Sequence, residues 1–153
     1  MKKRNKAYRP RQVIPDVMQY VKTGMAPLSV AATVLNRVQV ANHGAMDSLT
    51  KGKGTRQDTI TLGHMLITAK ALAKHSIGRD WLPELEEAEA ALKAVQARGG
   101  RYVMRAAEIT ALNLALEVHD AQLDGCTVKQ MEDAITAAKD AILHNHEVLA
   151  LTP

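Results

Sequence analysis

The sequence predicts an all-α protein, a compact bundle of about five helices with a basic N-terminal arm. Apolar residues recur at spacings of three and four, and no long segment alternates apolar and polar residues as a strand does. Alanine is abundant and aromatic residues make up only 3% of the chain, which favours close packing between helices. The length of 153 residues suits one domain. We therefore expect residues 1–15 to form the arm and residues 16–153 to form a single helical domain.

The arm is defined by its charge and its prolines. Residues 1–12 contain six cations and no carboxylate. Pro10 and Pro15 each push the preceding residue toward an extended conformation. Asp16 can cap a short helix that runs to Lys22. The apolar contacts of this short helix are Val17, Tyr20 and Val21.

The next predicted helix begins with Ser29 as its N-cap and runs to about Thr50. Asn42 lies in the middle of its apolar stripe, where a hydrogen-bonded buried amide is the usual interpretation. Gly44 weakens the helix by about 1 kcal/mol relative to alanine. We expect either the close approach of another helix at this glycine or a break near His43–Gly44. The apolar stripe consists of Ala31, Val34, Leu35, Val38, Ala41, Ala45 and Leu49.

Two further helices follow a loop at Lys51–Gly54. Thr55–Asp58 resembles a capping box with aspartate in place of glutamate, and the helix behind it stops near Gly78. Asp80 can cap the following helix, which ends at Gly99-Gly100. The stripe of the first helix is Leu62, Met65, Leu66, Ala69, Leu72 and Ala73, and that of the second is Trp81, Leu85, Ala88, Leu92 and Val95.

The last two predicted helices differ in how their apolar residues are spread. One begins between Tyr102 and Arg105, ends at Gly125 and is apolar on two sides. Such a helix is expected at the centre of a bundle or at the contact between the subunits of a homodimer. Thr127–Gln130 is a second capping-box pattern, and the helix behind it runs to about Leu149.

The residues that could carry catalysis do not form a known catalytic pattern. A helical metal-dependent phosphohydrolase is the remote alternative, because His119-Asp120 resembles part of its ligand set. The remaining ligands would have to be His64, His75, Asp133 or Asp140. The two histidines fall on the polar face of their helix, and the two aspartates are too close to the pair in sequence. We expect His119 to be a hydrogen-bonded core or interface histidine, and we expect no enzyme, no metal and no cofactor.

The single cysteine and the absence of long apolar runs indicate a cytoplasmic protein. Cys126 cannot form an internal disulfide, and without a neighbouring histidine it lacks the base that a thiol nucleophile needs. No apolar run approaches the roughly 18 residues that span a bilayer. The basic N-terminus is not followed by the apolar stretch of a secretory signal.

Charge is divided unevenly along the chain. Residues 1–80 hold 14 Lys/Arg and 4 Asp/Glu, a balance of +10, whereas residues 81–153 hold 6 and 12, a balance of −6. This split indicates a polyanionic partner or the docking of unlike surfaces. The loop Lys51–Arg56 places two glycines and three cations before a helix N-terminus, where backbone N–H groups favour a phosphate. A solvated turn is the alternative interpretation. The predicted contact residues are Lys2, Lys3, Arg4, Arg9, Arg11, Lys51, Lys53 and Arg56.

The acidic part of the chain is concentrated in one predicted helix. Its carboxylates are Glu84, Glu86, Glu87 and Glu89. A solvated helix face is the usual interpretation of such a cluster, and the early acids favour the helix dipole. The functional alternative is an acidic surface that occupies the nucleic-acid groove of a partner.

Several blocks of the sequence resemble small accessory proteins encoded by bacteriophages and prophages of proteobacteria. The blocks are residues 2–11, Ala41–Leu49, Lys51–Arg56 and Ala111–Gln122. The resemblance implies a phage context, in which small proteins without active sites bind and disable host machines, including CRISPR surveillance complexes. It thus implies a non-enzymatic protein that binds and blocks a host defence or nucleoprotein complex, as an anti-CRISPR protein does. The alternative is a phage regulator that binds nucleic acid directly, although the sequence lacks a clear helix-turn-helix.

Overall fold

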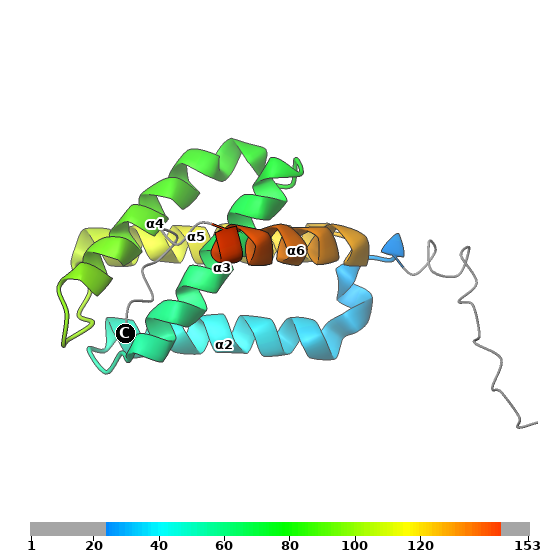
Figure 1. The fold of residues 1–153 in the computed structure, drawn as a ribbon. Helices are drawn as coiled ribbons and strands as arrows, with labels where there is room; N and C mark the ends of the chain where they lie inside the picture. Colours follow the sequence, from blue (N-terminus) through cyan, green and yellow to red (C-terminus); the bar gives the residue numbers. More distant parts are fainter. Residues whose placement is uncertain (1–23, 145–153) are drawn as a thin grey trace, which may run out of the picture.

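The computed structural model describes residues 24–144 of the chain. The described residues form helices and loops, with no strand and one isolated antiparallel bridge between Pro27 and Thr127. The elements in order are a 3₁₀ helix η1 (Leu28–Ala31), α2 (Ala32–Thr50), α3 (Arg56–Lys74), a 3₁₀ helix η2 (Arg79–Trp81), α4 (Leu82–Ala97), α5 (Ala106–Gly125) and α6 (Val128–His144). The predicted all-α bundle with five main helices is confirmed (Figure 1). The predicted arm, the short helix from residue 16 to 22 and the last residues up to Leu149 lie outside the described residues.

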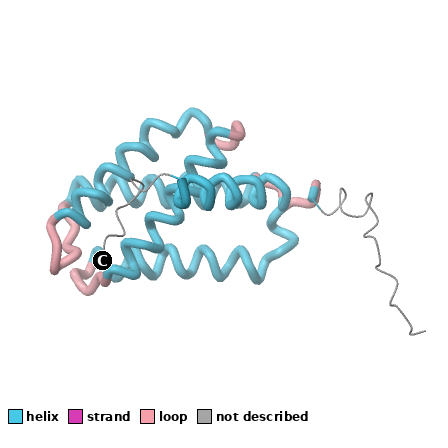
Figure 2. The backbone as a smooth tube through the Cα atoms, viewed as in Figure 1, coloured by secondary structure: helices cyan, strands magenta, loops and turns pink. Residues whose placement is uncertain are grey.

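The bundle is arranged around α3 and α5. Helix α3 packs against all four other long helices, and α5 packs against α2, α3, α4 and η1. Helices α2, α5 and α6 run along the same axis of the molecule, while α3 and α4 cross it obliquely (Figure 2). Buried side chains of α5 belong to both core clusters, Leu112 and Val118 to the larger one and Leu123 to the smaller one. The prediction that the helix with two apolar sides lies centrally is therefore confirmed.

Both predicted capping boxes are present. The backbone N–H of Asp58 donates to Thr55 Oγ1 at 3.3 Å, and the backbone N–H of Thr55 donates to Asp58 Oδ2 at 2.7 Å. At the start of α6, Gln130 N donates to Thr127 Oγ1 at 3.3 Å, and Thr127 N donates to Gln130 Oε1 at 2.8 Å. These bonds satisfy backbone donors that a helix N-terminus otherwise leaves unpaired.

Helix α2 differs from its prediction in three ways. Ser29 does not cap it, because residues 28–31 form the 3₁₀ helix that leads into it. A Cβ atom built on Gly44 meets no atom within 4 Å, and the helix is unbroken from Ala32 to Thr50. Both explanations offered for this glycine are therefore wrong. Val34 is 59% exposed while Met46 is buried, because only the side of the wide apolar stripe that faces α3 and α5 is covered.

The start of α4 also departs from the prediction. Asp80 makes no capping hydrogen bond, because it lies inside η2, and η2 follows Gly78 in a left-handed conformation with φ of 76°. Trp81 is 44% exposed and not part of the core, whereas the remaining members of its predicted stripe are fully buried. The missing cap is offset by Pro83, which lies in the first turn of α4 and needs no hydrogen-bond partner for its nitrogen.

The core is built from leucine and alanine. Its largest fully buried side chains include Leu49, Leu62, Leu66, Leu72, Leu85, Leu92, Leu112 and Leu123. Helix α6 contributes only alanines, Ala134 and Ala138, to the buried set. None of the helices in the described range has the length and apolar content that a membrane span requires.

Candidate functional site

Two interhelical loops lie at the same end of the bundle. Residues 51–55 connect α2 to α3, and residues 98–105 connect α4 to α5. Figure 1 shows both loops at the left end of the molecule. Leu49, near the end of α2, and Met104, in the second loop, both belong to the main buried cluster. We call this region the basic end, and its cations are Lys51, Lys53, Arg56, Arg98, Arg101 and Arg105.

The first loop is held tightly against the core. Gly52 has a φ of 69°, a conformation that glycine adopts without strain. A Cβ atom on Gly54 would lie 2.9 Å from Leu49 Cγ and 3.0 Å from Leu49 Cα, so only glycine fits there. Lys51 Nζ contacts Asp47 Oδ2 at 2.7 Å, and Lys53 is exposed. The loop thus presents its cations outward from a closely packed backbone.

The second loop is organised by Glu108. The two terminal nitrogens of the Arg98 guanidinium each donate to a Glu108 carboxylate oxygen at 2.6 Å. Arg98 Nη2 also donates to Val103 O at 2.8 Å, and the Arg105 backbone N–H donates to Glu108 Oε2 at 2.7 Å. The hydrogen bonds from Arg98 outweigh the effect of burial and hold the pKa of Glu108 below its ordinary value. This network fixes the loop so that Arg101 and Arg105 are exposed.

The basic end carries a net positive charge. Residues 47–58 and 97–108 together contain six Lys/Arg and three Asp/Glu, so their balance is +3. The C-termini of α2 and α4 lie at this end together with the N-termini of α3 and α5, so their helix dipoles oppose one another and side-chain charge sets the potential. An exposed surface of this kind attracts phosphates or carboxylates of a partner.

The structure brings together residues that sequence reasoning had considered separately or had missed. Of the predicted contact residues, Lys51, Lys53 and Arg56 lie at the basic end, and the other five lie outside the described residues. The three arginines of the second loop were not predicted. Their signal is present in the sequence, because residues 98–105 combine two glycines with cations before a helix, as residues 51–56 do.

The histidines and carboxylates do not assemble the phosphohydrolase ligand set. Asp120 pairs with His43 of α2, with Nε2 and Oδ2 2.7 Å apart, and not with His64 or His75. Between residues 24 and 144, no group of three or more His, Cys, Asp and Glu side chains is placed to hold a metal ion. The hydrogen bond between His43 and Asp120 instead connects α2 to α5.

His119 and Cys126 are buried groups of the core. His119 is 1% exposed, and burial lowers its pKa to about 4. The expected core position of His119 is therefore confirmed. The expected hydrogen bonding is not found at Nδ1, which has no hydrogen-bond partner. Burial raises the pKa of the Cys126 thiol, which disfavours the thiolate that a nucleophile requires.

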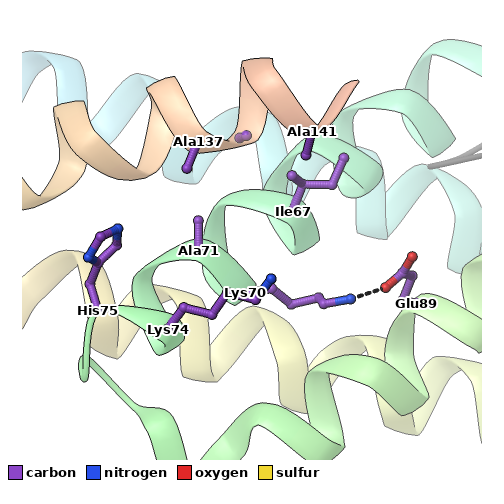
Figure 3. A pocket seen from close by; sticks show the side chains of 9 residues that line it. Ile67, Lys70, Ala71, Lys74, His75, Glu89, Ala137 and Ala141 are labelled. Atoms are coloured by element: carbon purple, nitrogen blue, oxygen red, sulfur yellow. Dashed lines mark hydrogen bonds and ion pairs between the residues drawn. The ribbon is translucent and has the colours of Figure 1, made fainter. Parts of the chain in front are cut away.

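A concavity between α3, α4 and α6 is the other feature that could accept a ligand. Ile67 and Ala71 of α3 and Ala137 and Ala141 of α6 line it, and Lys70 forms an ion pair with Glu89 across it (Figure 3). Its volume of about 170 Å³ is smaller than the roughly 300 Å³ at which ordinary ligand pockets begin.

The one carboxylate that lines this concavity, Glu89, is held by two lysines. Burial opposes ionisation of Glu89, but hydrogen bonds and charge attraction from Lys70 and Lys93 outweigh it and lower the pKa of Glu89. Glu89 is therefore not part of a solvated acidic face, whereas Glu86 and Glu87 are exposed as expected. The basic end is the stronger candidate site, because Lys53, Arg101 and Arg105 are exposed there.

Comparisons of the chain with protein-family models, with curated proteins and with solved structures find no match.

Proposed function

We propose that this chain is a non-enzymatic binding protein of a phage or other mobile element. It occupies a site on a host nucleoprotein complex and blocks it, in the manner of an anti-CRISPR protein. The basic end of the bundle makes the contact, together with the cations of the N-terminal arm. The phage context rests on the sequence resemblance, and the contact surface rests on the structure.

The observation that carries the proposal is the gathering of cations from two loops that are far apart in sequence. Residues 51–56 and 98–105 contribute three cations each to one end of the molecule. Both loops present exposed cations at that end, Lys53 in the first and Arg101 and Arg105 in the second. The exposed cations Lys53, Arg101 and Arg105 favour anionic groups as the contacts.

The mechanism is electrostatic and steric. Long-range attraction between the basic end and the phosphates of a nucleoprotein complex raises the rate of encounter. Packing at the contact then sets the lifetime of the complex, because affinity within one interface is tuned mainly through dissociation. The bound bundle excludes the natural nucleic acid from the surface that it covers.

A pull-down from a bacterial lysate tests the proposal. The tagged full chain is used with and without nuclease, and bound material is identified by mass spectrometry. We expect a stoichiometric host protein partner that survives nuclease treatment. If the full chain retains no such partner under any salt condition, the proposed function is wrong.

Charge reversal locates the contact. Lys51→Glu, Lys53→Glu and Arg56→Glu form one variant, and Arg101→Glu with Arg105→Glu forms the second. The matched control reverses Arg37 and Lys139, which are also exposed cations but lie in α2 and α6 away from the basic end. We expect both basic-end variants to lose partner binding at physiological salt and the control to keep it. Equal binding by all variants would refute the assignment of the basic end.

Direct binding of nucleic acid is the second candidate function. The exposed basic end favours it, because phosphate contacts supply most sequence-independent affinity. If about three phosphates are neutralised, log K should fall with log salt concentration at a slope of about −3. In this case the pull-down recovers nucleic acid, and every protein is lost after nuclease treatment. A flat salt response would contradict this candidate.

A further inference from the structure

Trp81 lines a groove on the surface of the bundle. It is the only tryptophan of a chain that has no phenylalanine, and it is 44% exposed. The groove lies between the turn before η2 and the last turns of α5, and its volume is about 220 Å³. Its lining residues are Ile77, Gly78, Trp81, Val118, Ala121 and Gln122.

The volume of this groove suits one side chain of a partner. It exceeds the roughly 150 Å³ of a cavity that can hold benzene. It is smaller than the roughly 300 Å³ at which pockets for whole small-molecule ligands begin. A single large side chain therefore fits the groove better than a cofactor does.

The walls of the groove are fixed by hydrogen bonds within the protein. Gln122 Nε2 donates to Ala69 O at 3.0 Å and to Ile77 O at 2.7 Å, so α5 is tied to α3 and to the turn before η2. A Cβ atom on Gly78 would lie 3.2 Å from Gln122 Nε2, so this turn packs closely against the same amide. Gln122 is 2% exposed, and its Oε1 atom has no hydrogen-bond partner among the described residues. The groove is thus formed without a ligand.

The surface around the groove is acidic. Residues 77–84 and 117–124, which include every lining residue, together contain five Asp/Glu and one Lys/Arg, so their balance is −4. The one cation is Arg79, which is exposed. Helix α5 starts at the basic end, and the groove lies about 20 Å further along this helix. The groove and the basic end therefore differ in position and attract ligands of opposite charge.

Two carboxylates of α5 flank the groove. Glu117, Ala121 and Asp124 are spaced at i, i+4 and i+7, so they lie on one strip of the helix. Ala121 lines the groove, and the two acids are exposed on either side of it. Neither acid forms an ion pair among the described residues. Both are therefore available to a cation.

We propose that this groove binds an arginine side chain from a basic segment of a partner protein. A guanidinium stacks on an indole face, pairs with carboxylates and keeps its charge at physiological pH. Trp81 supplies the indole, and Glu117 and Asp124 supply the carboxylates. Arginine and tryptophan are also the residues that most often dominate the binding energy of protein interfaces. The proposal does not rest on the proposed function, because it concerns a different surface.

The spacing of the two carboxylates defines the pattern of the partner segment. Glu117 and Asp124 are about 10 Å apart along the helix axis. Residues that are three positions apart in an extended peptide are also about 10 Å apart. The partner segment therefore carries two arginines with two residues between them. One arginine enters the groove against Trp81, and the other pairs with the carboxylate that the first leaves free.

A synthetic peptide tests the proposal on the purified full chain. The probe is the acetylated and amidated six-residue peptide Ala-Arg-Ala-Ala-Arg-Ala. The control peptide has citrulline, a neutral side chain of nearly the same shape, in place of each arginine. Isothermal titration calorimetry measures affinity at physiological salt. Because Trp81 is the only tryptophan, a change of its fluorescence emission on titration locates the bound peptide at the groove.

Protein variants separate the groove from general charge. Glu117→Gln with Asp124→Asn neutralises the two flanking acids. The matched control is Glu86→Gln with Glu87→Gln, which makes the same change in net charge at two exposed acids of α4 that do not line the groove. Trp81→Leu removes the indole. Thermal unfolding checks that each variant is folded.

We expect the arginine peptide to change the emission of Trp81 and to bind at least fivefold more tightly than the citrulline peptide. The Glu117/Asp124 variant and Trp81→Leu should each lose at least fivefold in affinity, and the α4 control should bind as the parent protein does. Equal binding of the two peptides, or an equal loss in the α4 control, would overturn the proposal. An arginine peptide that neither releases heat nor alters the emission would overturn it too. The assay contains no host protein, so its failure is distinguishable from failure of the proposed function.

Discussion

Replacing Gly54 by alanine should destabilise the protein, although the same change usually stabilises a loop. The added Cβ would lie 2.9 Å from Leu49 Cγ and 3.0 Å from Leu49 Cα. Leu49 is fully buried in the main core, so its side chain cannot move without disturbing its neighbours. Its Cα belongs to α2, so relief also requires the helix end to shift.

The magnitude follows from two opposing effects. Overpacking of a close-packed site costs about 1–3 kcal/mol. The reduced freedom of the unfolded chain returns about 0.4–1 kcal/mol. We expect a net loss of about 1–2 kcal/mol, and for a chain of this size each kcal/mol shifts Tm by about 2–4 °C.

Gly44→Ala provides the matched control, because it is the same substitution and is expected to raise the stability of the protein. A Cβ at this position meets nothing within 4 Å, and the residue lies inside the exposed side of α2. Gly44→Ala should therefore stabilise the protein by about 0.5–1 kcal/mol. Urea unfolding followed by circular dichroism measures both variants. The reasoning about the Gly54 contact is refuted if the two substitutions change the unfolding midpoint in the same direction.

Three further predictions concern buried polar groups. Because the pKa of His119 falls from 6.5 to about 4 on folding, the unfolded state binds more protons in this window, and stability should drop by about 3 kcal/mol as pH falls from 6.5 to 4. His119→Leu should flatten that part of the urea-unfolding profile, and an unchanged slope would contradict it. The pKa of Glu108 is lowered by Arg98, so its contribution is present above the unfolded value of about 4.3 and is lost as pH falls through the lower folded value. In acid titration, Glu108→Gln should make stability less dependent on pH below about 4.3, whereas a profile identical to that of the parent protein would argue against the pair. Gln122 donates to Ala69 O at 3.0 Å and to Ile77 O at 2.7 Å, so Gln122→Leu should cost about 1–3 kcal/mol in thermal unfolding, and a neutral effect would exclude this role.

Element boundaries were largely predictable because they depend on neighbours in sequence. Thr55 and Thr127 accept hydrogen bonds from backbone groups three residues away, and such contacts can be recognised without knowledge of the fold. Gly99 and Gly100 end α4 through their own left-handed conformations. Ser29 and Asp80 were wrongly predicted to be N-caps for one shared reason. Each lies in a 3₁₀ helix that precedes the α-helix.

Contacts between distant elements were less predictable. Which face of an alanine-rich helix becomes buried depends on where the neighbouring helices lie. Val34 was predicted in the apolar stripe of α2 but is exposed for this reason. Glu89 was grouped with solvated acids because its partner Lys70 belongs to another helix. The second half of the basic end was missed for the same reason, since only the fold brings residues 98–105 to the end that holds residues 51–56.

The bridge between Pro27 and Thr127 has a consequence for the order of folding. Contacts between α2 and α3, between α3 and α4, and between α4 and α5 join elements that follow one another in the chain. Such contacts have low contact order and form rapidly. The bridge instead closes a loop of about 100 residues, whose entropic cost must be met before its two hydrogen bonds form. Since α6 begins at Val128, directly after the bridge, we expect α6 to dock last and to be the first helix to exchange its amide hydrogens.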